Sequence, residues 1–125
     1  MEASTATNKL RILIVEDEPF IALTLEDLLD ELGFVVAGTV SRVSDALDFI
    51  NREAIDGALL DVNLGSQKID PVADLLDQRG CSFIFTTGYG RSGIPAAHAH
   101  RPVLQKPFGM DQLAAILLSE IPRAK

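Results

Sequence analysis

The stretch Leu13–Pro19, "LIVEDEP", places three consecutive acidic residues and a proline directly after an apolar run. The apolar run, Leu10–Val15, predicts a strand buried on both faces, because such a strand lacks the alternation of a half-exposed one. Carboxylates crowded at the end of a buried strand raise the pKa of one partner unless a cation lies between them. The stretch therefore predicts a strand whose end contributes acidic groups to a cation site.

Outward from this stretch, strands and helices alternate along the chain. Short apolar runs predict four further strands, at Phe34–Ala37, Ala58–Leu60, Phe83–Phe85 and Val103–Leu104. Such alternation is typical of an α/β fold in which a parallel sheet lies between two layers of helices. We therefore expect a doubly wound α/β domain.

The helices between the strands have recognisable starts and ends. Apolar residues recur at helical spacing from Ile21 to Leu32, and Gly33 follows where a left-handed residue commonly ends a helix. We expect Ser41 or Ser44 to cap a second helix, Pro71 to open a third, and a last helix to run from about Asp111 to Ile121.

The segment Gly88–Arg101, "GYGRSGIPAAHAHR", interrupts this alternation. It contains three glycines and a proline, and too few apolar residues for a stable helix. We expect the fourth helix to be short, irregular or mobile. His98 and His100 would face apart on a helix, so we expect both to be exposed rather than to bind a metal.

Length and charge limit the class of protein. A chain of 125 residues with 47% apolar residues suits one domain, which we place at 9–125, after a flexible tail at 1–8. The formal charge of −7 argues against nucleic acid or an anionic membrane as the main partner. The single cysteine, Cys81, permits no intrachain disulfide, and no stretch has membrane-spanning length, so we expect a cytoplasmic protein.

Polar residues follow the predicted strands at the edge where the carboxyl ends of parallel strands meet. Glu16 and Asp17 follow the first strand, Asp61 the third, Thr87 the fourth and Lys106 the fifth. Carboxylates without a convergent cysteine or histidine suit Mg²⁺. An aspartate beside Mg²⁺, a lysine and a hydroxyl group is equipped to accept a phosphoryl group, so we expect Asp61 to be the nucleophile, assisted by Lys106 and Thr87.

Four motifs in this order, "LIVEDEP", "LLDVNLG", "FTTGYG" and "LQKPF", resemble the receiver domain of bacterial two-component response regulators. The second and third, with a short interval before the lysine, are similar to the single-domain FATGUY-type receivers. The resemblance implies a flavodoxin-like (βα)5 sandwich whose five parallel strands lie in the order 2-1-3-4-5.

The same resemblance implies roles for individual residues. Asp17 and Asp61 would bind Mg²⁺ directly, Glu16 largely through water, and Asn63 through its backbone carbonyl, which leaves the Asn63 side chain freer. The peptide bond between Lys106 and Pro107 is commonly cis in this family.

The implied function is that of a single-domain response regulator without an output domain. It would take a phosphoryl group from a sensor histidine kinase or a phosphotransfer protein, and then bind a downstream protein or act as a phosphate sink. It would not be a turnover enzyme, and it would be a monomer or a weak homodimer.

The expected switch comprises Thr87, Gly88, Tyr89 and the position of Val103. Many receivers have an aromatic residue at that last position, and its ring swings when the threonine moves. Because residue 103 is a valine, this coupled movement cannot be assumed here. We expect instead that Thr87, once bonded to a phosphoryl oxygen, orders or shifts the segment 88–101.

Two other classes of protein compete with this interpretation. A phosphatase of the haloacid dehalogenase type also uses a strand-end aspartate and Mg²⁺, but Asn63 occupies the place of its second, acid-base aspartate. A nucleotide or flavin binder would need a glycine-rich phosphate loop after the first strand, which the sequence lacks.

Overall fold

The computed structural model describes residues 9–91 and 93–121. The strands are β1 (Arg11–Val15), β2 (Val35–Val40), β3 (Gly57–Asp61), β4 (Ser82–Thr87) and β5 (Val103–Gln105). The helices are α2 (Pro19–Glu31), α3 (Val43–Arg52), α4 (Asp70–Gln78) and α5 (Met110–Glu120), with a 3₁₀ turn, η1 (Ala96–His98), before β5. The expected tail at 1–8 lies outside the described residues.

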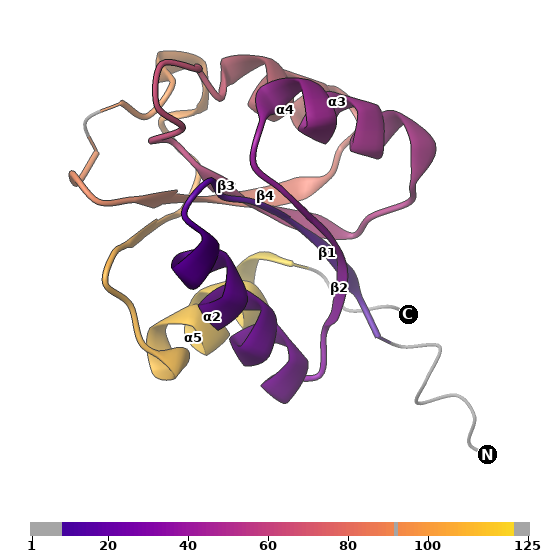
Figure 1. Cartoon of the computed structure of the whole chain (residues 1–125), viewed down its shortest axis with the longest axis vertical. Helices are drawn as coiled ribbons and strands as arrows, with labels where there is room; N and C mark the ends of the chain where they lie inside the picture. Colours follow the sequence, from indigo (N-terminus) through magenta and orange to yellow (C-terminus); the bar gives the residue numbers. More distant parts are fainter. Residues whose placement is uncertain (1–8, 92, 122–125) are drawn as a thin grey trace.

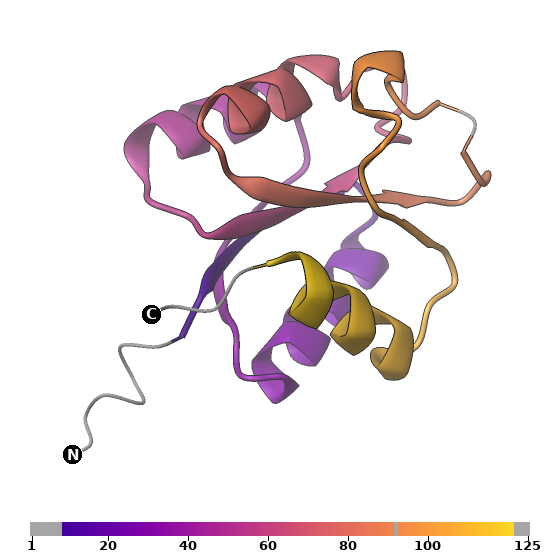
Figure 2. The same cartoon turned by 180° about the vertical axis from the view of Figure 1, so that it is seen from behind.

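All five strands are parallel and lie in the order β2-β1-β3-β4-β5, which confirms the predicted doubly wound fold. Helices α2 and α5 cover one face of the sheet, and α3 and α4 cover the other (Figure 1). The view from behind shows the same two layers (Figure 2). Each face of the sheet has its own apolar cluster, because β1, β3 and β4 are buried on both sides.

The strand order places one crevice at the carboxyl ends of β1 and β3. The chain leaves β1 toward β2 and returns to β3 on the other side, so the loops after β1 and β3 diverge. Val15 pairs with Leu60, so the residues that follow this pair in each chain segment are neighbours. This register brings Glu16 next to Asp61.

The ends of the helices follow the sequence in part. Gly33 has φ +90° and follows α2, as predicted. The Glu18 carboxylate accepts the Phe20 N–H and so caps the start of α2. The prediction that Ser41 or Ser44 caps α3 was wrong, because the Gln67 side chain, from the loop before α4, accepts the Val43 N–H at 2.8 Å.

The reduced fourth helix is confirmed, since η1 is the only helical turn described between β4 and β5. The prediction that His98 is exposed was wrong: it is 4% exposed, and its Nε2 lies 2.7 Å from Asp74 Oδ1 on α4. Its ring packs edge-on against Phe83. Arg101 also packs against Phe83, with its guanidinium carbon 4.2 Å from the centre of that ring. The same guanidinium group donates a hydrogen bond to the Asp77 carboxylate on α4. Two side-chain contacts, His98 with Asp74 and Arg101 with Asp77, therefore hold the end of this segment against α4.

No helix among the described residues combines the length and apolar character that crossing a bilayer requires.

Candidate functional site

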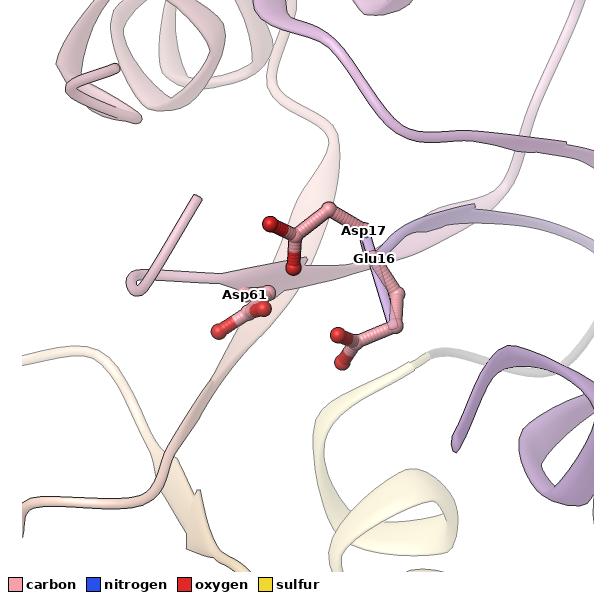
Figure 3. Close-up of side chains that lie close together, drawn as sticks. All are labelled: Glu16, Asp17 and Asp61. Carbon is pink, nitrogen blue, oxygen red and sulfur yellow. The ribbon is translucent and has the colours of Figure 1, made fainter. Parts of the chain in front are cut away.

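Three carboxylates meet at the crevice between β1 and β3. The Glu16 N–H donates to the Val40 carbonyl at 2.9 Å, which extends the sheet by one residue, and Asp61 is the last residue of β3. Glu16, Asp17 and Asp61 each offer one oxygen, and these oxygens all lie within 4.8 Å of one another (Figure 3). Glu16 and Asp61 are buried whereas Asp17 is exposed, so the cluster opens to solvent on one side.

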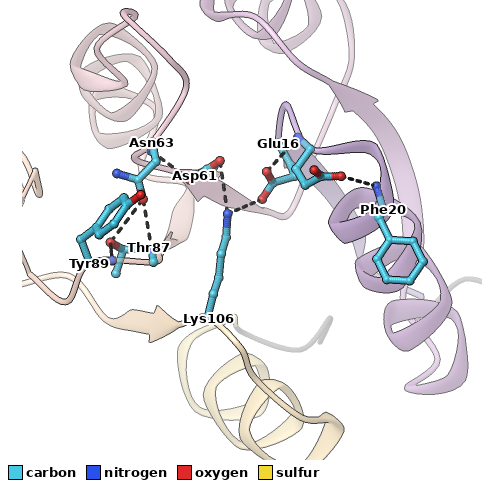
Figure 4. A network of polar contacts seen from close by, with 9 residues as sticks. Glu16, Phe20, Asp61, Asn63, Thr87, Tyr89 and Lys106 are labelled. Carbon is cyan, nitrogen blue, oxygen red and sulfur yellow. Dashed lines mark hydrogen bonds and ion pairs between the residues drawn. The ribbon is translucent and has the colours of Figure 1, made fainter.

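Lys106 reaches this cluster from the end of the edge strand β5. Its backbone N–H donates to the Thr87 carbonyl at 2.8 Å, directly after β5. Its Nζ lies 2.9 Å from Glu16 Oε1 and 3.4 Å from Asp61 Oδ2 (Figure 4). The Lys106–Pro107 peptide bond is cis. Residues from three distant parts of the sequence therefore form one ion-pair cluster.

Burial and like charge set the electrostatics of the cluster. Burial, and then the adjacent Asp61, raise the pKa of Glu16 to about 7, although Lys106 opposes this shift. Burial disfavours the charged form of Lys106, but its contacts with Glu16 and Asp61 outweigh burial and raise its pKa. Near neutral pH the cluster thus holds more carboxylate charge than the single ammonium group compensates.

The donor set fits a hard divalent cation. All three side chains offer oxygen, and one of them faces solvent, which suits Mg²⁺ because this ion keeps several waters and takes one or two carboxylates. A cation beside Asp17 would also offset the charge that Lys106 leaves uncompensated. Glu18 does not join the cluster, because its carboxylate caps α2.

Asn63 contacts both the acidic cluster and the end of β4. Its N–H donates to Asp61 Oδ1 at 2.9 Å, which fixes that carboxylate. The expectation of a freer Asn63 side chain was wrong: its Oδ1 accepts the Gly88 N–H at 3.1 Å and lies 3.4 Å from the Thr87 hydroxyl. The sequence carried a general signal for this contact, since asparagine in loops commonly bonds to nearby backbone groups.

The expected switch residues lie in two places. Thr87 is fully buried, and its hydroxyl accepts the Tyr89 N–H at 3.1 Å, so Thr87, Gly88 and Tyr89 form one connected turn. Tyr89 itself is 75% exposed. Val103 does not join this turn. It pairs with Phe85 within the sheet and packs against the apolar cluster on the α3 and α4 face.

Comparison with known proteins agrees with this geometry. A family model for the response regulator receiver domain matches residues 12–118. The chain is 34% identical over 110 residues to the phyllosphere-induced regulator PhyR of Methylorubrum extorquens, covering 85% of this chain and 41% of that protein. The chain thus spans about two-fifths of the length of this relative.

Solved structures show the same likeness. The solution structure of SdrG from Sphingomonas melonis Fr1 is 45% identical, with a TM-score of 0.80 over 95% of this chain and 98% of SdrG. The crystal structure of PhyR from Brucella abortus is 26% identical, with a TM-score of 0.78 over 95% of this chain and 51% of that chain. The sheet order, the acidic crevice and these matches together place the chain in the response regulator receiver domain family.

Proposed function

We propose that this receiver domain accepts a phosphoryl group on Asp61 in a Mg²⁺-dependent reaction. The observation that carries the proposal is the convergence of Lys106 on Glu16 and Asp61, with Asp17 beside them at the solvent side. A nucleophilic carboxylate flanked by a fixed ammonium group and a cation site is the arrangement that phosphoryl transfer requires.

Asp17 and Asp61 would hold Mg²⁺ directly, Glu16 through a water molecule, and Asn63 through its backbone carbonyl. When bound, Mg²⁺ supplies positive charge that neutralises the phosphoryl oxygens. The exposed position of Asp17 leaves room for metal-bound water, and the buried Glu16 keeps negative charge behind it.

The protein side chains then perform the transfer. One Asp61 oxygen forms the bond to phosphorus while the phosphorus–nitrogen bond of a phosphohistidine donor breaks, and the imidazole nitrogen keeps that electron pair. The Asn63 N–H holds Asp61 Oδ1, so the carboxylate meets the donor in one orientation. The Lys106 ammonium group and the Thr87 hydroxyl would stabilise the charge on the phosphoryl oxygens.

The phosphodonor is proposed to be a histidine kinase or a phosphotransfer protein that docks beside α2. A groove of about 370 Å³ with a largely apolar lining runs from Phe20 and Ile21 to Pro107 and Phe108, and Lys106 also lines it. Phe20 is 77% exposed and Leu23 58%. An apolar surface that ends at Lys106 lets a protein partner bury these side chains while its phosphohistidine reaches Asp61.

The output is proposed to be protein binding or removal of phosphate from a relay, with the receiver spanning residues 9–125. Self-phosphorylation and hydrolysis of the aspartyl phosphate would be its only chemistry. One matched PhyR structure is described as that of a stress response regulator, and we extend the same kind of circuit to this chain.

Intact mass after incubation with a small phosphodonor and Mg²⁺ tests the proposal. The wild type should gain one phosphoryl group, Asp61→Ala should gain none, and Asp48→Ala, which removes an exposed aspartate on α3, should behave as the wild type. Equal gain by Asp61→Ala would contradict the assignment. Sustained turnover of a phosphate ester, abolished in Asp61→Asn, would instead favour the phosphatase class.

A further inference from the structure

Asn63 contacts both the Asp61 carboxylate and the turn after β4. Its backbone N–H bonds to Asp61, while its side chain bonds to Gly88 and Thr87 (Figure 4). A backbone N–H can only donate, so the Asn63 atom that faces Gly88 is the acceptor oxygen Oδ1. The orientation of the amide is therefore fixed by its surroundings.

The Thr87 hydroxyl has one proton and two neighbours in the resting arrangement. It can donate to Asn63 Oδ1 at 3.4 Å while it accepts the Tyr89 N–H at 3.1 Å. A phosphoryl oxygen on Asp61 would need that same proton. Turning the hydroxyl toward the phosphoryl group would therefore remove one contact of Asn63, and the rotation of the side chain would also move the oxygen that accepts the Tyr89 N–H.

We propose that the Asn63 side chain is a positioning residue that holds the Thr87–Tyr89 turn in its resting arrangement and competes with the phosphoryl group for the Thr87 hydroxyl. This role rests on the proposed phosphorylation of Asp61. In this way a change at Asp61 would reach the turn through hydrogen bonds. These bonds run from Asp61 to Asn63, and from Asn63 to Gly88 and, through the Thr87 hydroxyl, to Tyr89. Such a route does not need an aromatic residue at position 103.

The bond to Gly88 is the stronger of the two side-chain contacts. At 3.1 Å it has ordinary hydrogen-bond length, whereas 3.4 Å to the Thr87 hydroxyl is long. Asn63 should therefore keep Gly88 in place while it releases Thr87 readily. The turn would pivot at Gly88, and the exposed Tyr89 would move.

Amide hydrogen exchange of the unphosphorylated protein tests the holding role with two matched variants. Asn63→Leu keeps the side-chain volume but removes the acceptor, whereas Asn63→Asp keeps an acceptor oxygen. Loss of one such bond should speed exchange of the Gly88 amide roughly fivefold in Asn63→Leu, and Asn63→Asp should retain protection. Unchanged Gly88 exchange in Asn63→Leu, or equal acceleration in both variants, would overturn the proposal.

A second measurement uses the wild type alone and so does not depend on a variant that folds. A scalar coupling across the hydrogen bond between the Gly88 nitrogen and the Asn63 side-chain carbonyl should be present. Beryllofluoride with Mg²⁺, as a phosphoryl mimic, should shift the Tyr89 amide resonance. An absent coupling, or a Tyr89 resonance that stays in place once beryllofluoride is bound, would overturn the proposal.

These measurements distinguish failure of the Asn63 proposal from failure of the proposed phosphorylation of Asp61. Phosphoryl uptake is measured by intact mass, and its absence in the wild type would overturn the proposed function. The Gly88 exchange ratio is measured without phosphate and tests the Asn63 contact alone.

Discussion

Replacement of Lys106 by methionine tests how the acidic site is held together. The change removes the ammonium group that lies 2.9 Å from Glu16 Oε1 and 3.4 Å from Asp61 Oδ2, and it keeps an unbranched apolar side chain. Both carboxylate side chains are 1% exposed, so water cannot replace the lost partner. Loss of one partner of a buried ion pair costs about 3–5 kcal/mol of the free energy of unfolding.

The cost should depend on pH in a defined direction. Glu16 has a pKa of about 7 in the fold against an ordinary value of 4.5, so the folded chain holds this proton more tightly than the unfolded chain. The stability that Glu16 contributes is therefore complete below pH 4.5 and falls by about 3 kcal/mol as the pH rises to 7 and above. Without Lys106 the pKa of Glu16 should rise further, because this ammonium group lowers it.

Urea unfolding without metal, at pH 5 and pH 8, measures this effect. The loss of stability in Lys106→Met should be larger at pH 8 than at pH 5 by about 1 kcal/mol, because Glu16 is protonated at pH 5 and mainly ionised at pH 8 in the wild type, whereas the contact with Asp61 is lost at both pH values. Lys68→Met, which removes an exposed lysine in the loop before α4, should change stability little at either pH. An equal loss at both pH values would refute the ion-pair reasoning. Added Mg²⁺ should restore part of the loss at pH 8.

Three further predictions follow from the same structure. Mg²⁺ binding at pH 7 should release about half a proton, because the pKa of Glu16 is about 7 and the metal favours its ionised form. Titration calorimetry in two buffers of different ionisation enthalpy measures this proton release. Binding heats that do not depend on the buffer would contradict the prediction. Asp74→Ala should lower stability by about 1–3 kcal/mol, because the buried His98 Nε2 loses its partner, whereas His100→Ala, at an exposed position, should change urea stability little. Phe20→Ser should slow transfer from a phosphorylated histidine protein roughly tenfold but not from a small phosphodonor, and equal slowing for both donors would argue against the docking groove.

The sequence was sufficient for the architecture because the local patterns agree with the tertiary fold. Apolar runs predicted all five strands, since central strands such as β1 and β3 are buried on both faces. The glycine-rich segment before β5 predicted the missing helix, because its composition opposes helix formation. The strand-end residues Asp61 and Lys106 were located by topology alone, since parallel strands end at one edge.

The sequence failed where one residue depends on a distant one. Gln67 caps α3 from a loop that is remote in sequence, so the nearby serines were the wrong choice. His98 is buried because α4 presents Asp74 and β4 presents Phe83, and neither neighbour is visible from the spacing of two histidines. Helix starts and side-chain burial are therefore decided by packing that a local pattern does not encode.

The same packing limits which part of the switch segment can respond to Asp61. Residues 96–101 are tied to α4 through His98 and Arg101, whereas Gly88 is tied to the loop after β3 through Asn63. A chemical change at Asp61 would reach Gly88 through the contacts of Asn63. It would reach residues 96–101 only through the chain that connects them to Gly88. Because residue 103 is a valine that lies within the sheet and packs against its core, this position offers no aromatic ring to link β5 to Thr87. Motion on phosphorylation should therefore be largest at Tyr89, and the exposed Tyr89 side chain is the group through which a partner would sense it.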